Sequence, residues 1–142
     1  MRKNNLKIPA MILLLIVAGA VLYLTFQGPQ ETTSLSEAFR EKAMLLGYKG
    51  DVLQFRSDIH LLEYFIVGIA VAIFGIVMNY PIWIPGVMGC GFGLIDECIK
   101  ILLPTREFSA VDLIKDCIGV WVAVAVVYGV RWGSKRWKFA HR

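Results

Sequence analysis

Charged residues are scarce in this chain. They make up 18% of its 142 residues, whereas 57% of the residues are hydrophobic and the mean hydropathy is +0.62. Soluble globular domains carry about 25% charged residues, so this composition excludes an ordinary water-soluble domain. We expect a small membrane protein with a single domain, residues 1–142, because its one extended polar segment is too short to fold alone.

Cysteine is also rare. The three cysteines all lie in apolar runs and form no Cys-x-x-Cys motif, which excludes the disulfide framework of a small secreted protein. Small thiol side chains pack well in apolar interiors, so we expect Cys90, Cys98 and Cys117 to be core residues. The alternative is that Cys98 and Cys117, at similar depth, form a thiol pair or bind a metal.

Recognisable catalytic motifs are missing as well. The sequence contains no Gly-x-Ser-x-Gly, His-Glu-x-x-His or phosphate-binding loop, which excludes the enzyme classes that those motifs mark. It also lacks a basic stripe interleaved with aromatic residues, so we expect no nucleic-acid partner. Whether the chain is an enzyme stays open at this point.

Four long apolar runs predict the fold. A helix of about 20 apolar residues spans the hydrocarbon core of a bilayer, and the runs have this length. The sequence therefore predicts an all-α membrane protein, a four-transmembrane-helix bundle with spans at 8–26, 59–79, 82–103 and 111–130. The first run follows a basic start like a signal peptide, but it is long and has no small-x-small cleavage site, which favours a retained helix. Gly86, Gly89 and Gly93 share one helix face, a pattern typical of close helix packing.

The external segment 27–58 separates the first two spans. Ser34-x-x-Glu37 matches a capping box, and apolar residues follow at helical spacing up to Gly47. We expect a short amphipathic helix over 35–47 that lies on the bilayer surface. A loosely ordered loop is the alternative.

Lysine and arginine counts predict the orientation, because cytoplasmic loops carry an excess of these residues. Eight lie on the side of the two termini and five lie on the opposite side, among residues 40–56 and in the loop at Arg106. Both termini are therefore predicted to be cytoplasmic, in a multi-pass protein.

Nine ionisable residues lie in or beside the last three spans. With the predicted topology they all fall in the outer two turns or in the loop at 104–110, where a charge is costly unless it is paired, protonated or hydrated. We interpret them, together with Tyr64, which shares a face with the first two, as a site. The alternative is a set of structural ion pairs and side chains that extend to the interface. The nine are His60, Glu63, Asp96, Glu97, Lys100, Arg106, Asp112, Lys115 and Asp116.

The charge of this group constrains its ligand. Five carboxylates face three cationic side chains, an excess of two negative charges if His60 is neutral. Such an excess requires protons, water or a bound cation, and it disfavours a simple phosphate pocket. A divalent cation is a possible cofactor, although the spacing matches no strict metal motif. We also expect Arg106 to form a bidentate contact with Glu97 or Asp112.

At these positions the chain resembles the VanZ-like family of bacterial integral membrane proteins. One departure is Lys100, where many relatives carry glutamine. The resemblance implies a multi-pass protein of the bacterial cytoplasmic membrane, and the founding member is linked to low-level resistance to the glycopeptide teicoplanin. The matching residues are His60 and Tyr64, Asp96 and Glu97, Pro104 and Arg106, and Asp112, Asp116 and Gly119. The stretch after the first span, Thr25-Phe26-Gln27 with Thr32 to Ser36 downstream, also resembles the Ser/Thr-rich exit of this family.

Two functions follow as hypotheses. The first is a cell-envelope protein with an outward-facing polar pocket that binds an amphiphile, either a lipoglycopeptide or a lipid-linked cell-wall precursor, with membrane lipids as further partners. The second is an intramembrane hydrolase, assisted by acid and base groups or by a metal, that acts on a lipid headgroup. Its candidate catalytic residues are His60, Glu97 and Asp112, with Arg106 stabilising negative charge.

Overall fold

The chain folds into helices throughout the part that the structure describes. The computed structural model describes residues 4–26, 29–103 and 107–140, and within these ranges there is no strand. The prediction of an all-α protein is therefore confirmed. A short 3-10 turn (Asn4–Leu6) precedes five helices: α1 (Lys7–Phe26), α2 (Pro29–Leu45), α3 (Val52–Met78), α4 (Trp83–Ile101) and α5 (Ala110–Ala140).

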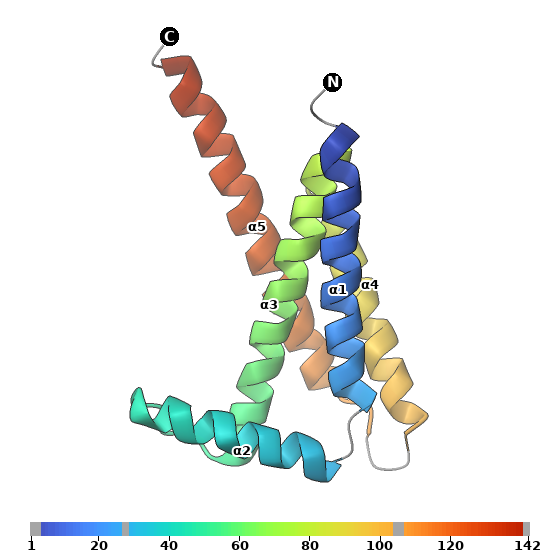
Figure 1. Cartoon of the computed structure of the whole chain (residues 1–142), viewed down its shortest axis with the longest axis vertical. Helices are drawn as coiled ribbons and strands as arrows, with labels where there is room; N and C mark the ends of the chain where they lie inside the picture. The colour runs from blue at the N-terminus through green and yellow to red at the C-terminus, as the bar shows by residue number, and fades with distance from the viewer. Residues whose placement is uncertain (1–3, 27–28, 104–106, 141–142) are drawn as a thin grey trace.

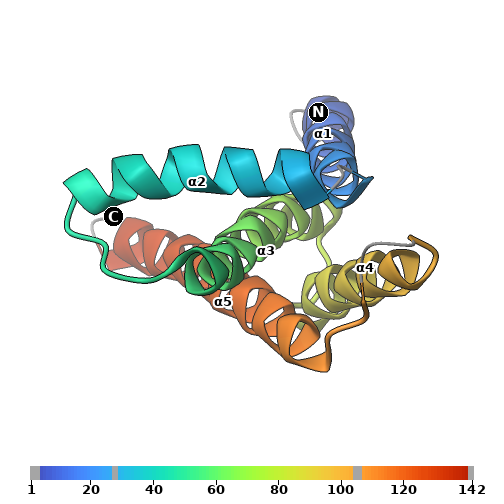
Figure 2. The ribbon, with the colours of Figure 1, turned by 90° about the horizontal axis from the view of Figure 1, so that it is seen from below.

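Four of the helices run along the long axis of the molecule, and α2 lies across one end of them (Figure 1). The central helix is α3, which contacts α1, α2, α4 and α5. Seen from the α2 end, α3 lies between α1 and α5 (Figure 2). The first turn of α1 and the last turn of α5 lie at the end opposite to α2, so both ends of the chain are on the same side.

Two helical segments are long and apolar enough to cross a membrane. They are Lys7–Phe26 and Asp58–Met78, with mean hydropathies of 2.5 and 2.4 over their most apolar windows. The helices α4 and α5 coincide with the third and fourth predicted spans but are not among these segments, and both carry ionisable residues. The described residues thus yield two candidate spans and not the predicted four.

Three helix boundaries differ from the prediction. Helix α3 begins at Val52, seven residues early, because the Asp51 side chain caps it by accepting from the N–H of Gln54 at 2.7 Å. Helix α2 begins at Pro29, a residue suited to a first turn, so Ser34 lies inside the helix and the predicted capping box is wrong. Helix α5 continues ten residues beyond 130. The predicted stop at Gly47 is confirmed, since its φ is +97°.

Glycines bring the long helices close together. A Cβ on Gly119 of α5 would lie 2.7 Å from the carbonyl oxygen of Leu61 in α3, and one on Gly68 would lie 2.8 Å from that of Val120. Gly86 and Gly89 of α4 pack against Trp121 and Val120 of α5 in the same way. The predicted packing role of the α4 glycines is therefore confirmed. The buried core forms from residues of α1, α3 and α5, with partly buried residues of α4 packed against it.

The cysteines are all free. Cys90 and Cys117 are half-buried and interact across the interface of α4 and α5. Cys98 is exposed, so its prediction as a core residue is wrong, and the cysteine that meets Cys117 is Cys90. The reason is helical phase: Cys98 follows the buried pair Asp96 and Glu97 on the opposite face of α4.

Candidate functional site

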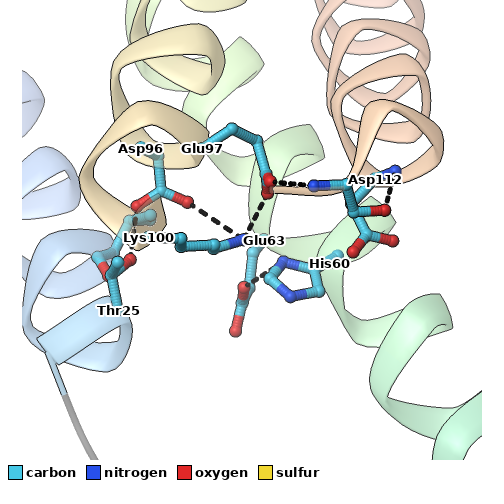
Figure 3. Close-up of polar contacts among 9 residues, drawn as sticks. Thr25, His60, Glu63, Asp96, Glu97, Lys100 and Asp112 are labelled. Carbon is cyan, nitrogen blue, oxygen red and sulfur yellow. Dashed lines mark hydrogen bonds and ion pairs between the residues drawn. The ribbon is translucent and has the colours of Figure 1, made fainter. Parts of the chain in front are cut away.

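Most of the polar residues singled out from the sequence that the structure describes lie together at the end of the bundle that α2 crosses. They come from the first turns of the candidate span Asp58–Met78 in α3, the last turns of α4 and the first turns of α5 (Figure 3). This follows from the alternating direction of the helices, because an end of one helix lies beside the start of the next. The five residues at the centre are buried, between 0 and 4% exposed: Thr25, Asp96, Glu97, Lys100 and Asp116. We call these five the buried polar cluster.

Lys100 lies at the centre of the cluster. Its Nζ donates a hydrogen bond to Glu97 Oε1 and lies 3.6 Å from Asp96 Oδ2. Both carboxylates can reach Lys100 from the same side of α4 because it follows Glu97 by three residues and Asp96 by four. A buried ammonium with two carboxylate neighbours is therefore built within two turns of one helix.

Two further residues, which the sequence did not assign to the site, also contact this group. The hydroxyl of Thr25, in the last turn of α1, lies 3.0 Å from the carbonyl oxygen of Val21 and contacts Asp96 Oδ1. The backbone N–H of Ser109 donates to Glu97 Oε2 at 2.9 Å. In the sequence, Thr25 could have been noticed as a threonine hydroxyl near the end of the first apolar run, at the depth of the cluster. Its contact with Asp96 joins a fourth helix, α1, to the site.

Ser109 also starts α5. Its hydroxyl oxygen accepts from the backbone N–H of Asp112 at 3.2 Å, the geometry of a helix N-cap. The pattern Ser109-x-x-Asp112 is a capping-box sequence, which was the available signal for this residue. The cap places the start of α5 beside Glu97, because the same serine contacts both (Figure 3).

Asp116 differs from the other buried acids. Its side chain is 0% exposed, and neither of its carboxylate oxygens has a hydrogen-bond partner among the described residues. It packs beside Gly93, where a Cβ would lie 3.6 Å from its Oδ2. The hydroxyl of Tyr64 is also buried and lies near Asp96 and Asp116 without a well-formed hydrogen bond to either. This side of the cluster thus holds a carboxylate and a phenol hydroxyl that form no well-aligned hydrogen bond with other described residues.

A partly exposed rim borders the buried polar cluster. His60 Nδ1 lies 3.4 Å from Glu63 Oε2, and the two side chains are 23% and 22% exposed. Asp112 is half-buried at the start of α5. These three residues are the partly exposed part of the site (Figure 3).

The buried charges do not balance. Among the residues that the structure describes, three carboxylates and one ammonium are buried here, so their formal charge is −2 when all of them are ionised. Carboxylates only accept hydrogen bonds, which means that the site can take up donors or positive charge. A ready metal site is not formed by the described part of the chain, in which no three His, Cys, Asp or Glu side chains are arranged to hold an ion.

One predicted residue, Arg106, lies outside the described residues, so its contact with Glu97 or Asp112 stays a prediction. The contacts that the structure does give to Glu97 are Lys100 and Ser109. Lys115 is half-buried on α5 and makes an interaction of its own.

Comparisons with known proteins identify no relative: no family model, no curated protein and no solved structure matches the chain. The resemblance to the VanZ-like family therefore stays a prediction from the quoted residues. The function has to be argued from the site itself.

Proposed function

We propose that this chain is a multi-pass protein of the bacterial cytoplasmic membrane, with both termini inside, that binds the polar headgroup of an amphiphile at the α2 end of the bundle. The observation that carries the proposal is the buried polar cluster with its partly exposed rim. Ionisable residues held at one depth by four helices are costly in a membrane, and such residues mark binding or transport sites.

The surface of the long helices supports a membrane location. Large apolar side chains are exposed on each of them, far more than a soluble monomer leaves in contact with water. Lipid tails are as apolar as these side chains, so covering this surface with lipid carries no free-energy cost. Examples are Leu15 and Ile16 on α1, Leu62 and Ile66 on α3, Leu94 and Ile95 on α4, and Val122 and Val126 on α5.

The orientation is supported by charge. The end of the bundle at which the chain begins and finishes is the basic one, which is the cytoplasmic side by the positive-inside rule. The rim and α2 then face outward, where an amphiphile from the outer leaflet arrives. α2 lies across the bundle end, as a helix on a bilayer surface would.

The chemistry of the site favours a headgroup rich in N–H and O–H donors. The excess of carboxylates disfavours a bare phosphate and suits amines, amides and sugar hydroxyls. A lipoglycopeptide and a lipid-linked cell-wall precursor both offer such groups on a lipid tail. Binding of one of them, with a contribution to low-level glycopeptide tolerance, is the function that we propose, in line with the resemblance to VanZ-like proteins.

A second candidate is an intramembrane hydrolase. It is favoured by the contact between His60 and Glu63, since an imidazole oriented by a carboxylate is a common general base. Glu97 suits this role less well, because Lys100 and Ser109 already donate to both of its oxygens.

The experiment measures binding and tolerance on the same variants. Teicoplanin and a lipid-linked wall precursor are titrated into the purified chain in lipid nanodiscs, and tolerance is measured in cells with matched membrane levels. For a binding protein, His60→Gln lowers affinity about tenfold or more, the value of one lost hydrogen bond to a charged group, and tolerance falls with it. Glu41→Gln, on the exposed face of α2, is the matched control.

The enzyme candidate predicts a different result. His60→Gln or Glu97→Gln would then abolish tolerance while the affinity stays within a factor of about two, because chemistry and binding separate. Since Glu97→Gln also removes a partner of Lys100, the double variant with Lys100→Gln is its control. Absence of saturable binding to either amphiphile by the native chain would overturn the binding proposal.

A further inference from the structure

The basic end of the molecule has a second polar feature, far from the buried polar cluster. Arg131, on α5, is half-buried and lines a cavity with residues of the last turn of α3 and of the 3-10 turn that precedes α1. Its Nη1 donates to the carbonyl oxygen of Ile76 at 3.2 Å. A guanidinium carries five N–H donors, so this one bond to a helix end leaves most of them for other acceptors.

Arg131 lies between two cavities of different character. One, of about 250 Å³, is lined by polar and aromatic residues: Asn79, Tyr80, Tyr128 and Trp132 in addition to the arginine. The other, of about 260 Å³, is lined by the apolar residues Leu6, Ile76 and Val77 together with the arginine. The polar cavity suits the headgroup of a lipid and the apolar cavity suits its acyl chains, with the charged guanidinium of Arg131 between them.

The charged residues in the last 26 positions of the sequence, which include Arg131, are all basic. All eleven acidic residues of the sequence lie between Glu31 and Asp116, none of them in the last 26 residues. Among the residues that the structure describes, no carboxylate forms an ion pair with Arg131. Lys7 and Arg136 add positive charge at the same end of the bundle. A half-buried guanidinium in such surroundings lacks its anion.

Aromatic residues give this end the character of a membrane interface. The hydroxyl of Tyr128 donates to the carbonyl oxygen of Tyr80 at 3.0 Å, which fixes one wall of the polar cavity. The guanidinium of Arg136 stacks on the exposed ring of Trp132, with 4.0 Å between its Cζ and the ring centroid. Tyrosine and tryptophan concentrate where lipid headgroups meet the hydrocarbon core.

We propose that Arg131 binds the phosphodiester group of an anionic phospholipid of the inner leaflet. The phosphate occupies the polar cavity beside Tyr80 and Trp132, and the start of the acyl chains occupies the apolar cavity beside Leu6 and Val77. Arginine suits this role because its planar fork binds two phosphate oxygens at once. Basic pockets between membrane helices on the cytoplasmic side bind such headgroups. This site rests on the membrane location proposed above and is independent of the ligand at the α2 end.

The test compares three probes on the full chain, purified in a neutral detergent. Phosphatidylglycerol, phosphatidylcholine and inorganic phosphate are titrated, with bound lipid counted by native mass spectrometry and stabilisation followed as the shift in Tm. We expect phosphatidylglycerol to bind about tenfold or more tightly than phosphatidylcholine, in keeping with a charge-assisted bidentate contact. We expect no shift with inorganic phosphate, because it cannot use the apolar cavity.

Two variants assign the binding to Arg131. Arg131→Gln keeps a donor for the Ile76 carbonyl but removes the charge and the fork, and we expect it to abolish the preference for phosphatidylglycerol. Lys42→Gln, which removes a charge of equal sign from the exposed face of α2 at the other end of the bundle, is the matched control and should change affinity less than about threefold. Arg131→Lys should restore part of the preference, since it keeps the charge without the fork.

Three results would overturn the proposal: equal binding of the two lipids, an unchanged preference in Arg131→Gln, or a response to inorganic phosphate equal to that of the lipid, which would indicate a free-phosphate site. Equal binding of the two lipids would leave the membrane location intact. Failure of every lipid to bind, with a chain that stays dispersed without detergent, would instead contradict the location proposed above.

Discussion

Replacing Lys100 with methionine tests whether the buried polar cluster is held together by its single ammonium. The methionine has a similar length but cannot donate. Of their contacts with described residues, Glu97 then keeps the N–H of Ser109 and Asp96 keeps Thr25. Removing one partner of a buried ion pair costs about 3 to 5 kcal/mol, because an uncompensated charge stays behind. We expect the upper part of that range, since two carboxylates lose a cation at once.

The assay is reversible unfolding in mixed micelles, driven by a denaturing detergent and followed by tryptophan fluorescence and circular dichroism. Lys100→Gln separates charge from hydrogen bonding: the amide still donates to Glu97, so we expect a loss of only about 1 to 3 kcal/mol. Lys42→Met, on the exposed face of α2, should stay within about 0.5 kcal/mol of the native chain. A Lys100→Met variant as stable as the Lys42→Met control would refute the reasoning.

Two further predictions use the same unfolding assay. Asp116→Asn removes a buried charge that has no hydrogen-bond partner among the described residues, so we expect stability to rise by about 1 kcal/mol. A loss of that size would show that a bound proton or cation stabilises the native carboxyl. Gly119→Ala places a methyl group 2.7 Å from the carbonyl oxygen of Leu61 and should cost about 1 to 3 kcal/mol. Gly129→Ala, with no atom within 4 Å of the new methyl, should instead gain about 0.5 to 1 kcal/mol, and equal effects at the two positions would contradict the close approach of α3 and α5.

The sequence predicted the long helices well because their apolar runs are local signals. The ends of the helices were harder to predict. The Asp51 cap was overlooked because the residues after it are polar enough to read as loop, and α5 was predicted too short because its last ten residues are basic and not apolar. Helix α2 was placed too far along the chain, since Ser34 has the composition of a cap but lies inside a helix that begins at Pro29.

The site was predicted in part. Its acids and Lys100 stood out because ionisable residues are conspicuous in apolar runs, and helical spacing correctly grouped Asp96, Glu97 and Lys100. Thr25 was not predicted because its contact with Asp96 joins residues 71 positions apart, and no local pattern encodes such a contact. Spacing also does not predict that Glu97 accepts hydrogen bonds whereas Asp116 has no hydrogen-bond partner among the described residues. That difference depends on which donors the neighbouring parts of the chain place beside each carboxylate.

The continuity of α3 has a mechanical consequence. Its 27 residues form a rod of about 40 Å at 1.5 Å per residue, and both of its ends are fastened. Near the first end, the hydroxyl of Tyr48 donates to Asp58 at 2.8 Å and ties α3 to the segment that follows α2. At the other end, Arg131 holds the carbonyl oxygen of Ile76. A tilt of α3 would therefore move His60, near one end of the helix, and the cavity beside Arg131, at the other end, in the same motion.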